Sequence, residues 1–227
     1  SGLQLNLEVD ALKKITTEIK KPVTCIIGGS KISTKINVIT SLIEKINNLI
    51  IVGAMANNFF VYKNLKIGKS LIEENTNVII KKIYEKAEKN KWEILIPQDC
   101  VVSTSFDGDG ENKDLEAILD NEIILDIGPK TVESIKNKID QSNTVLWNGP
   151  AGYFENENFM TGTMFIANTI SKNTADKSLI SILGGGDTLA AINKSKNKLS
   201  FTHLSTAGGA FLEYIEGKDL PGLSVLK

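Results

Sequence analysis

The chain has 227 residues, 41% of them hydrophobic, and its 26 basic residues almost balance its 27 acidic ones. This is the composition of a globular protein with a substantial core, and it excludes a disordered chain. A net charge of −1 gives no electrostatic footprint for nucleic acid or for an anionic membrane surface. We therefore expect neither as a partner.

All 26 basic residues are lysines. Arginine is the usual residue for gripping a carboxylate or phosphate at two points, so part of such a clamp is missing if the ligand is an anionic metabolite. The two cysteines, Cys25 and Cys100, lie far apart in apolar stretches, which predicts buried thiols in a reducing compartment. No apolar run is long enough to cross a membrane and none resembles a signal segment, so we expect a cytoplasmic protein.

Short apolar runs alternate with segments of helical period along the chain. The expected strands lie within 23–29, 48–53, 93–99, 122–128, 144–149, 178–186 and 201–206, and the expected helices within 34–46, 76–89, 130–139 and 163–172. Apolar strands that alternate with helices predict an α/β fold with a mainly parallel sheet and helices on both faces.

Glycine and polar residues follow five of these strands. The endings are Gly28-Gly29, Gly53, Gly128-Pro129, Asn148-Gly149-Pro150 and Gly184-Gly185-Gly186-Asp187. One glycine after a strand is ordinary turn chemistry. In folds of this class, however, ligands bind at the carboxyl ends of the strands. Five such endings on one edge of the sheet therefore indicate a binding site.

The run "GGGDTLAAI", residues 184–192, leads from glycines into a helix, and "STAGGAFLEYI", residues 205–215, has the same form. Glycine loops before helix N-termini bind phosphates through free backbone N–H groups. Asp187 would repel a phosphate, which leaves two interpretations. It is either the N-cap of the helix or a ligand of magnesium that joins it to phosphate oxygens.

Lys31 and Lys35, in "GGSKISTKI" at 28–36, add cations to the same edge. If a helix begins near residue 31, their spacing puts both on one face of its first turn, where the helix dipole disfavours cations. An anionic ligand would compensate for that placement, whereas ordinary surface lysines are the simpler alternative. The acidic run "DGDGEN" at 107–112 lacks the glycine position of a calcium loop and is expected to be a solvated turn.

Six segments together resemble the phosphoglycerate kinase family, and they follow that family's order. They are "IIGGSKISTKI", "IVGAMANNF", "LDIGPKT", "LWNGPAGYFE", "ILGGGDTLAAI" and "HLSTAGGAFLEYIEGKDLPG". The resemblance covers the family's C-terminal, nucleotide-binding half. It implies a Rossmann-like three-layer sandwich with a six-stranded sheet, a helix at 1–20 that links two lobes, and a nucleotide-binding domain at 21–227. The lobe that holds 3-phosphoglycerate with arginines has no counterpart in these 227 residues, which accounts for the missing arginine.

The same resemblance implies reversible phosphoryl transfer between 1,3-bisphosphoglycerate and ADP in glycolysis, with magnesium on the nucleotide. Lys31 matches the lysine that neutralises the phosphoryl group in transfer, and Gly208 and Gly209 match the helix N-terminus that faces it. Asp187 matches the magnesium ligand. The expected nucleotide-binding residues are Gly29, Lys35, Gly53, Ala54, Ile124, Leu125, Asn148, Pro150, Tyr153, Glu155, Gly184, Gly185, Gly186, Asp187 and Thr188.

Two residues depart from the family pattern: Ala54 and Ala207 stand where glycine is usual, and we expect both to be tolerated unless their φ must be positive. We expect a monomer that binds ADP or ATP with Mg²⁺ and, without the substrate lobe, catalyses little transfer. A stand-alone nucleotide-binding module without a catalytic role is the alternative. A dinucleotide-dependent oxidoreductase is a weaker one, because "GGSKIS" lacks the required glycine spacing.

Overall fold

The computed structural model describes residues 19–41 and 45–205. Its main sheet has six strands in the order β3-β2-β1-β7-β8-β9, and all neighbouring pairs are parallel. The strands are β1 (Val23–Ile27), β2 (Asn48–Ile51), β3 (Glu93–Leu95), β7 (Thr144–Asn148), β8 (Ile180–Gly184) and β9 (His203–Ser205). The expected α/β fold with a six-stranded parallel sheet is thereby confirmed.

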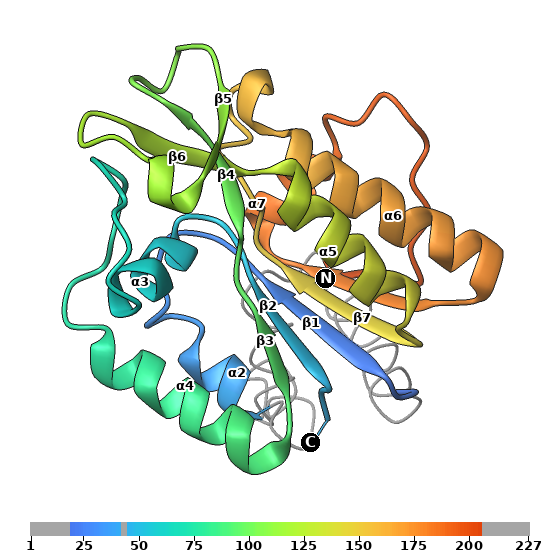
Figure 1. The fold of residues 1–227 in the computed structure, drawn as a ribbon. Coiled ribbons are helices and arrows are strands. Elements are labelled where there is room, and N and C mark those ends of the chain that lie inside the picture. The colour runs from blue at the N-terminus through green and yellow to red at the C-terminus, as the bar shows by residue number, and fades with distance from the viewer. Residues whose placement is uncertain (1–18, 42–44, 206–227) are drawn as a thin grey trace, which may run out of the picture.

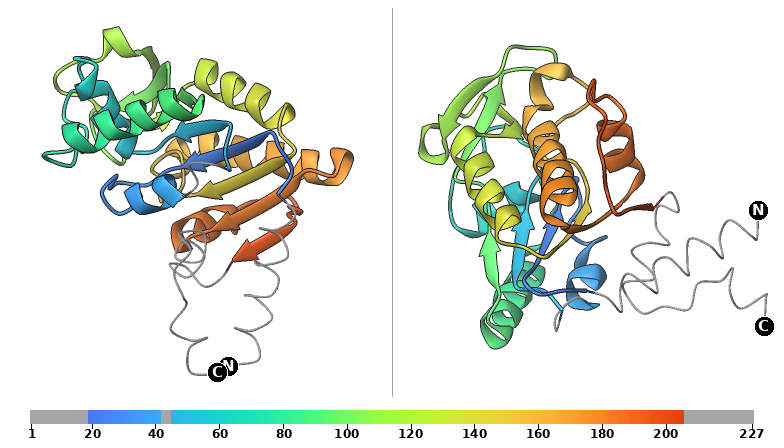
Figure 2. Two further views of the ribbon diagram at one scale, coloured as in Figure 1. Left: turned by 90° about the horizontal axis from the view of Figure 1, so that it is seen from below. Right: turned by 90° about the vertical axis from the view of Figure 1, so that its right-hand side faces the viewer.

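Helices cover both faces of this sheet, as Figures 1 and 2 show. One layer contains α2 (Ile36–Ser41), α3 (Met55–Tyr62) and α4 (Asn77–Asn90). The other contains α5 (Pro129–Asp140), α6 (Thr161–Lys177) and α7 (Gly186–Ile192). Two single-turn 3₁₀ helices, η1 (Leu115–Ala117) and η2 (Glu157–Phe159), lie in connections.

The core is divided between the two faces because successive side chains of a strand point in opposite directions. In β1, Cys25 and Ile27 pack with Phe59 of α3 on one face, whereas Ile26 packs with Ile166 of α6 on the other. All five side chains are at most 3% exposed. Burying an aliphatic or aromatic side chain of this size contributes roughly 1.5–3 kcal/mol to stability, so this double-sided burial is what fixes β1 at the centre of the sheet.

A second sheet differs from the sequence-based expectation. It is antiparallel, with the order β5-β4-β6, and consists of β4 (Asp99–Ser103), β5 (Glu111–Asp114) and β6 (Ile123–Ile127). The run at 122–128 forms β6 and therefore belongs to this small sheet. Gly128-Pro129 thus does not follow a strand of the main sheet, because β6 pairs with β4 and the chain then enters α5 directly.

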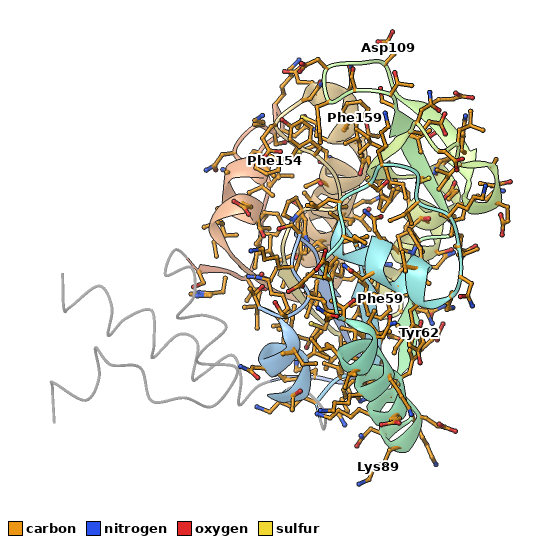
Figure 3. All side chains as sticks on the ribbon, turned by 90° about the vertical axis from the view of Figure 1, so that its left-hand side faces the viewer. Phe59, Tyr62, Lys89, Asp109, Phe154 and Phe159 are labelled. Carbon is orange, nitrogen blue, oxygen red and sulfur yellow. The ribbon has the colours of Figure 1, made fainter. Side chains whose placement is uncertain are left out.

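Two local expectations had different outcomes. α2 begins at Ile36, within the expected 34–46 but not near residue 31, so Lys31 and Lys35 both precede the helix. The expected solvated turn at 107–112 is confirmed only in part: residues 107–110 lie in the connection between β4 and β5, whereas Glu111 and Asn112 belong to β5. Asp109 lies at the outer edge of the molecule in Figure 3.

Both cysteine thiols are free and buried, and burial raises the pKa of each to about 12. Among residues 19–41 and 45–205, no helix combines the length and apolar character needed to cross a bilayer. The expected linking helix at 1–20 and the segment from residue 206 onward lie almost entirely outside the described residues.

Candidate functional site

The strands β1, β7 and β8 end side by side at one edge of the main sheet. Ile27 is the register partner of Asn148, and Asn148 is the partner of Gly184. The glycine-rich segments that follow these strands therefore meet in space. Two backbone bonds tie the segments together: Gly28 N donates to Asn148 O at 2.8 Å, and Gly53 N donates to Ala151 O at 3.1 Å.

Glycine is required where these segments touch. Gly149 has a φ of +100°, and a Cβ atom there would lie 2.3 Å from Gly28 O. Gly185 has a φ of +97°, and its Cβ would lie 2.8 Å from Asn148 Nδ2. By contrast, a Cβ at Gly29 or Gly186 would meet nothing within 4 Å. The first two glycines permit close packing, whereas the last two border open space that a ligand could enter.

The first of two adjoining pockets is largely apolar and has a volume of about 290 Å³. It lies between the ends of β1 and β2, the start of α3, the strand β6 and the segment after β7. Nine residues expected at a nucleotide site line it: Gly29, Gly53, Ala54, Ile124, Leu125, Pro150, Tyr153, Glu155 and Asp187.

The second pocket is polar, with a volume of about 370 Å³. Eight expected site residues line it: Gly29, Lys31, Lys35, Asn148, Gly185, Gly186, Asp187 and Thr188. Gly29, Ser30 and Asp187 line both pockets, so the two are parts of one groove. The groove can accept an elongated ligand with an apolar ring system at one end and an anionic group at the other.

Lys35 and Asn148 both line the polar pocket and contact each other. Lys35 Nζ donates a hydrogen bond to Asn148 Oδ1 at 2.5 Å. Burial lowers the pKa of Lys35, and the nearby carboxylate of Asp187 opposes that shift. Asn148 Nδ2 is buried and has no partner. An unpaired buried donor is costly, and an anion in this pocket would satisfy it.

The start of α7 distinguishes the two interpretations of Asp187. Gly185 is the N-cap residue of α7 and Asp187 is the second residue of the helix, so the N-cap interpretation is wrong. Asp187 is exposed in the groove. The neighbouring Thr188 is fully buried, and its hydroxyl accepts a hydrogen bond from Gly149 N at 2.7 Å. Thr188 therefore packs the strand ends together, which leaves Asp187 free to face a ligand.

The residues present fit a magnesium ion that is shared with a phosphate. The described ranges contain no group of three or more His, Cys, Asp or Glu side chains that could hold a metal by themselves. Asp187 supplies a carboxylate at the polar pocket, next to the open space at Gly186. Mg²⁺ commonly binds to one or two protein carboxylates and takes its other ligands from water and substrate phosphates.

The apolar pocket is held in shape by backbone contacts. Met55 N donates to Gly29 O at 2.9 Å, and Tyr153 N donates to Leu125 O at 2.7 Å. Ala54, which stands where the family usually has glycine, has a φ of −63°. This right-handed conformation suits any L residue, so the alanine causes no backbone strain. Ala207, the other departure, lies outside the described residues.

Several lining residues were not expected from the sequence: Asn57, Phe60, Leu71, Cys100, Phe106 and Asp126. Phe106 comes from the turn between β4 and β5 and packs edge-on against Tyr153, with ring centroids 5.1 Å apart. No strand ending or glycine loop marks these positions. Of the expected residues, Gly184 lies buried within β8 and lines neither pocket, and Gly208 and Gly209 lie outside the described part of the chain.

Comparison with known proteins places these features in a family. The family model for phosphoglycerate kinase matches residues 1–218. The phosphoglycerate kinases of Chelativorans sp. (strain BNC1) and Wolbachia pipientis wMel are 41% and 42% identical over 229 residues, which cover 100% of this chain and 58% of each relative. The chain thus spans a little over half the length of these relatives.

Solved structures agree with the sequence comparison. The phosphoglycerate kinase from Coxiella burnetii superposes with a TM-score of 0.89 at 39% identity, over 98% of this chain and 57% of that one. The enzyme from Pyrococcus horikoshii OT3 gives a TM-score of 0.78 at 28% identity, over 97% and 55%. On the family match, the identity of the relatives and the shared fold, the chain belongs to the phosphoglycerate kinase family.

Proposed function

We propose that this chain is the nucleotide-binding part of a phosphoglycerate kinase and that its groove binds ADP or ATP with Mg²⁺. The main support for the proposal is that an apolar pocket and a polar pocket adjoin and share the lining residues Gly29, Ser30 and Asp187. In the whole enzyme, the bound nucleotide would exchange a phosphoryl group with 1,3-bisphosphoglycerate.

The apolar pocket is suited to the adenine ring. Leu125 and Ile124 form part of one wall, and the backbone of Gly53 and Ala54 forms part of another. Flat glycine and alanine backbone allows close approach to a planar ring. Glu155 lies at the same pocket, and its carboxylate is suited to accept hydrogen bonds from the ribose hydroxyls.

The polar pocket is suited to the phosphate groups. Lys31 and Lys35 supply positive charge, Asn148 Nδ2 supplies an unpaired donor, and the backbone at Gly186 begins a helix. Magnesium at Asp187 would neutralise charge on the phosphate oxygens. Positioning and charge neutralisation account for most of the catalysis of phosphoryl transfer, and these residues supply both.

The chain by itself should bind nucleotide with little turnover. It spans 58% of the length of its relatives, and it contains no arginine with which to clamp 3-phosphoglycerate. Transfer also requires a second lobe that closes over the groove and excludes water. Turnover by this chain near the rate of a complete kinase would contradict this part of the proposal.

A calorimetric titration with ADP, with and without Mg²⁺, tests the proposed site. We expect Asp187→Ala to weaken ADP binding when Mg²⁺ is present and to have little effect without it, because the carboxylate acts through the metal. Asp109→Ala, at an exposed carboxylate that lines neither pocket, is the control and should bind like the parent chain. Failure of the folded parent to bind ADP would overturn the proposal.

A further inference from the structure

The segment that carries Glu155 past the apolar pocket belongs to no helix or strand. Tyr153 N bonds to Leu125 O at one end of the segment, and Asn156 Nδ2 bonds to Phe106 O at the other. Between these anchors, the carbonyl oxygens of Phe154 and Glu155 both accept hydrogen bonds from Lys194 Nζ, at 2.9 and 3.2 Å.

Lys194 makes a third contact with the same segment. Its Nζ lies 5.4 Å from the ring centroid of Phe154, a residue that is only 8% exposed and is labelled in Figure 3. An ammonium group has three N–H donors and is attracted to the face of an aromatic ring. The lysine therefore holds this irregular segment from two sides, through its carbonyl groups and through the ring.

Lys194 is itself fixed by the end of α7. Its backbone N–H donates to Ala191 O at 3.1 Å, and Ala191 and Ile192 are buried in the core. The same helix begins at the polar pocket with Gly186 and Asp187. α7 thus connects the two ends of the groove: its first residues face the polar pocket, and the lysine that follows it grips the segment of Glu155.

We infer that Lys194 is a positioning residue for nucleotide binding: it holds the backbone of Glu155 so that this carboxylate can accept hydrogen bonds from the ribose hydroxyls. The inference rests on the proposed function, because it takes the ligand to be a nucleotide. Lys194 does not contact the ligand in this arrangement. Its effect passes through Glu155 and depends on the ribose hydroxyls.

The test compares the binding of MgADP with that of Mg-2′,3′-dideoxy-ADP, which lacks both ribose hydroxyls. Lys194→Met keeps the apolar stem and removes the donors. We expect it to weaken the binding of MgADP about fivefold, which corresponds to the loss of roughly one net hydrogen bond. Binding of the dideoxy analogue should not change. Lys194→Arg, which keeps N–H donors, should restore most of the affinity for MgADP. Lys196→Met, at an exposed lysine two residues away, should bind both ligands like the parent.

A double-mutant cycle makes the test stricter. In a Glu155→Ala background, Lys194→Met should cause no further loss of MgADP affinity, because the acceptor that it positions is gone. Equal weakening of both ligands by Lys194→Met, or no weakening of either, would overturn this inference while leaving nucleotide binding intact. Absence of any nucleotide binding by the folded parent would overturn the proposed function and this inference together. If Lys194→Met does not fold, Lys194→Gln, whose shorter side chain cannot reach both carbonyls, replaces it in the same comparison.

Discussion

The ammonium group of Lys35 donates to the side-chain oxygen of Asn148 at 2.5 Å, joining two segments that are 113 residues apart in sequence. Because the oxygen faces the lysine, the other atom of the amide, Nδ2, must face away from it, and Nδ2 is buried without a partner. The lysine thus contributes a charge and also fixes the orientation of the amide. An anion in the polar pocket would receive donors from both residues.

The substitution Lys35→Met should weaken the binding of MgADP at least tenfold. It removes a charge-assisted contact of about 1.5–3 kcal/mol, and the amide of Asn148 loses the contact that sets its orientation. Adenosine, which has no phosphate, should bind as it does to the parent chain. Calorimetry with both ligands measures the difference. Lys89→Met, at an exposed lysine that extends from the end of α4 in Figure 3, is the control. Equal losses for ADP and adenosine would show that Lys35 acts on the fold and not on the phosphates.

Gly185 and Gly186 should respond oppositely to alanine. Gly185→Ala should lower the free energy of unfolding by about 1–3 kcal/mol, because its φ is +97° and the new Cβ would lie 2.8 Å from Asn148 Nδ2. Gly186→Ala should leave stability unchanged or slightly raised, since the site is helical and the Cβ meets nothing within 4 Å. Gly186→Ala should instead weaken the binding of MgADP, because the added methyl group would occupy the open space of the groove.

Urea denaturation and nucleotide titration of both variants separate the two effects. A Gly186→Ala variant that binds MgADP as tightly as the parent would mean that the ligand does not approach this part of α7.

The hydroxyl of Thr188 should matter for stability more than for binding. Thr188→Val keeps the shape but removes the acceptor of Gly149 N, a fully buried bond of 2.7 Å. We expect a loss of about 1–3 kcal/mol in the free energy of unfolding, the cost of an unpaired buried N–H. Thr188→Ser keeps the hydroxyl and should recover part of that loss. If Val and Ser variants were equally stable, the bond to Gly149 would contribute nothing measurable.

The edge of the main sheet was predictable from the sequence because its signals are local. Asn148 is the last residue of an apolar strand, and Gly29, Gly53 and Asp187 lie two or three residues after one. Parallel strands bring such positions to one edge. The prediction that the run at 122–128 belongs to the main sheet was wrong. An apolar β-branched run indicates a buried strand but does not identify the strand beside it. The structure pairs β6 with β4 in an antiparallel sheet.

α2 begins within the expected 34–46, but the condition that a helix begins near residue 31 is not met, although apolar spacing extends that far. Ile32, Ile36 and Ile39 follow a helical period, and Ile32 and Ile39 are fully buried. The backbone of 32–35 is nevertheless a turn, in which Ser33 N bonds to the Glu73 carboxylate at 3.1 Å. A contact from a residue 40 positions away cannot be read from the local pattern. Phe106 was missed for the same reason, since only tertiary packing brings its turn to the apolar pocket.

Replacement of Ala54 by the glycine usual in the family should change little in the site. Ala54 has a φ of −63° and precedes α3 in a right-handed conformation, so its methyl group is not strained. Ala54→Gly should lower the free energy of unfolding by about 0.5–1 kcal/mol, because glycine is more flexible in the unfolded chain. MgADP affinity should stay within about twofold of the parent value. A gain of tenfold or more would show that the methyl group obstructs the adenine pocket.

Asp126 should make stability depend on pH. It is 2% exposed, and burial raises its pKa from an ordinary 3.8 to about 7, although hydrogen bonds from Gly162 N and Ile127 N oppose the shift. Between these two values the folded state binds a proton that the unfolded state releases. The contribution of Asp126 to stability is therefore full below about pH 4 and is lost as the pH rises toward 7, by at most about 1.4 kcal/mol per pH unit.

Asp126→Asn removes this titration while keeping a side-chain oxygen that can accept from Gly162 N, which Asp126 Oδ2 contacts at 2.8 Å. The difference in free energy of unfolding, variant minus parent, should therefore increase from pH 4 to pH 7 and be constant above it. Urea denaturation at several pH values measures that difference. Asp109→Asn, at an exposed carboxylate, should follow the parent curve throughout. If the Asp126→Asn curve also ran parallel to the parent between pH 4 and pH 7, the carboxyl would have an ordinary pKa, and the apolar pocket would be lined by a buried negative charge that the bonds from Gly162 and Ile127 stabilise.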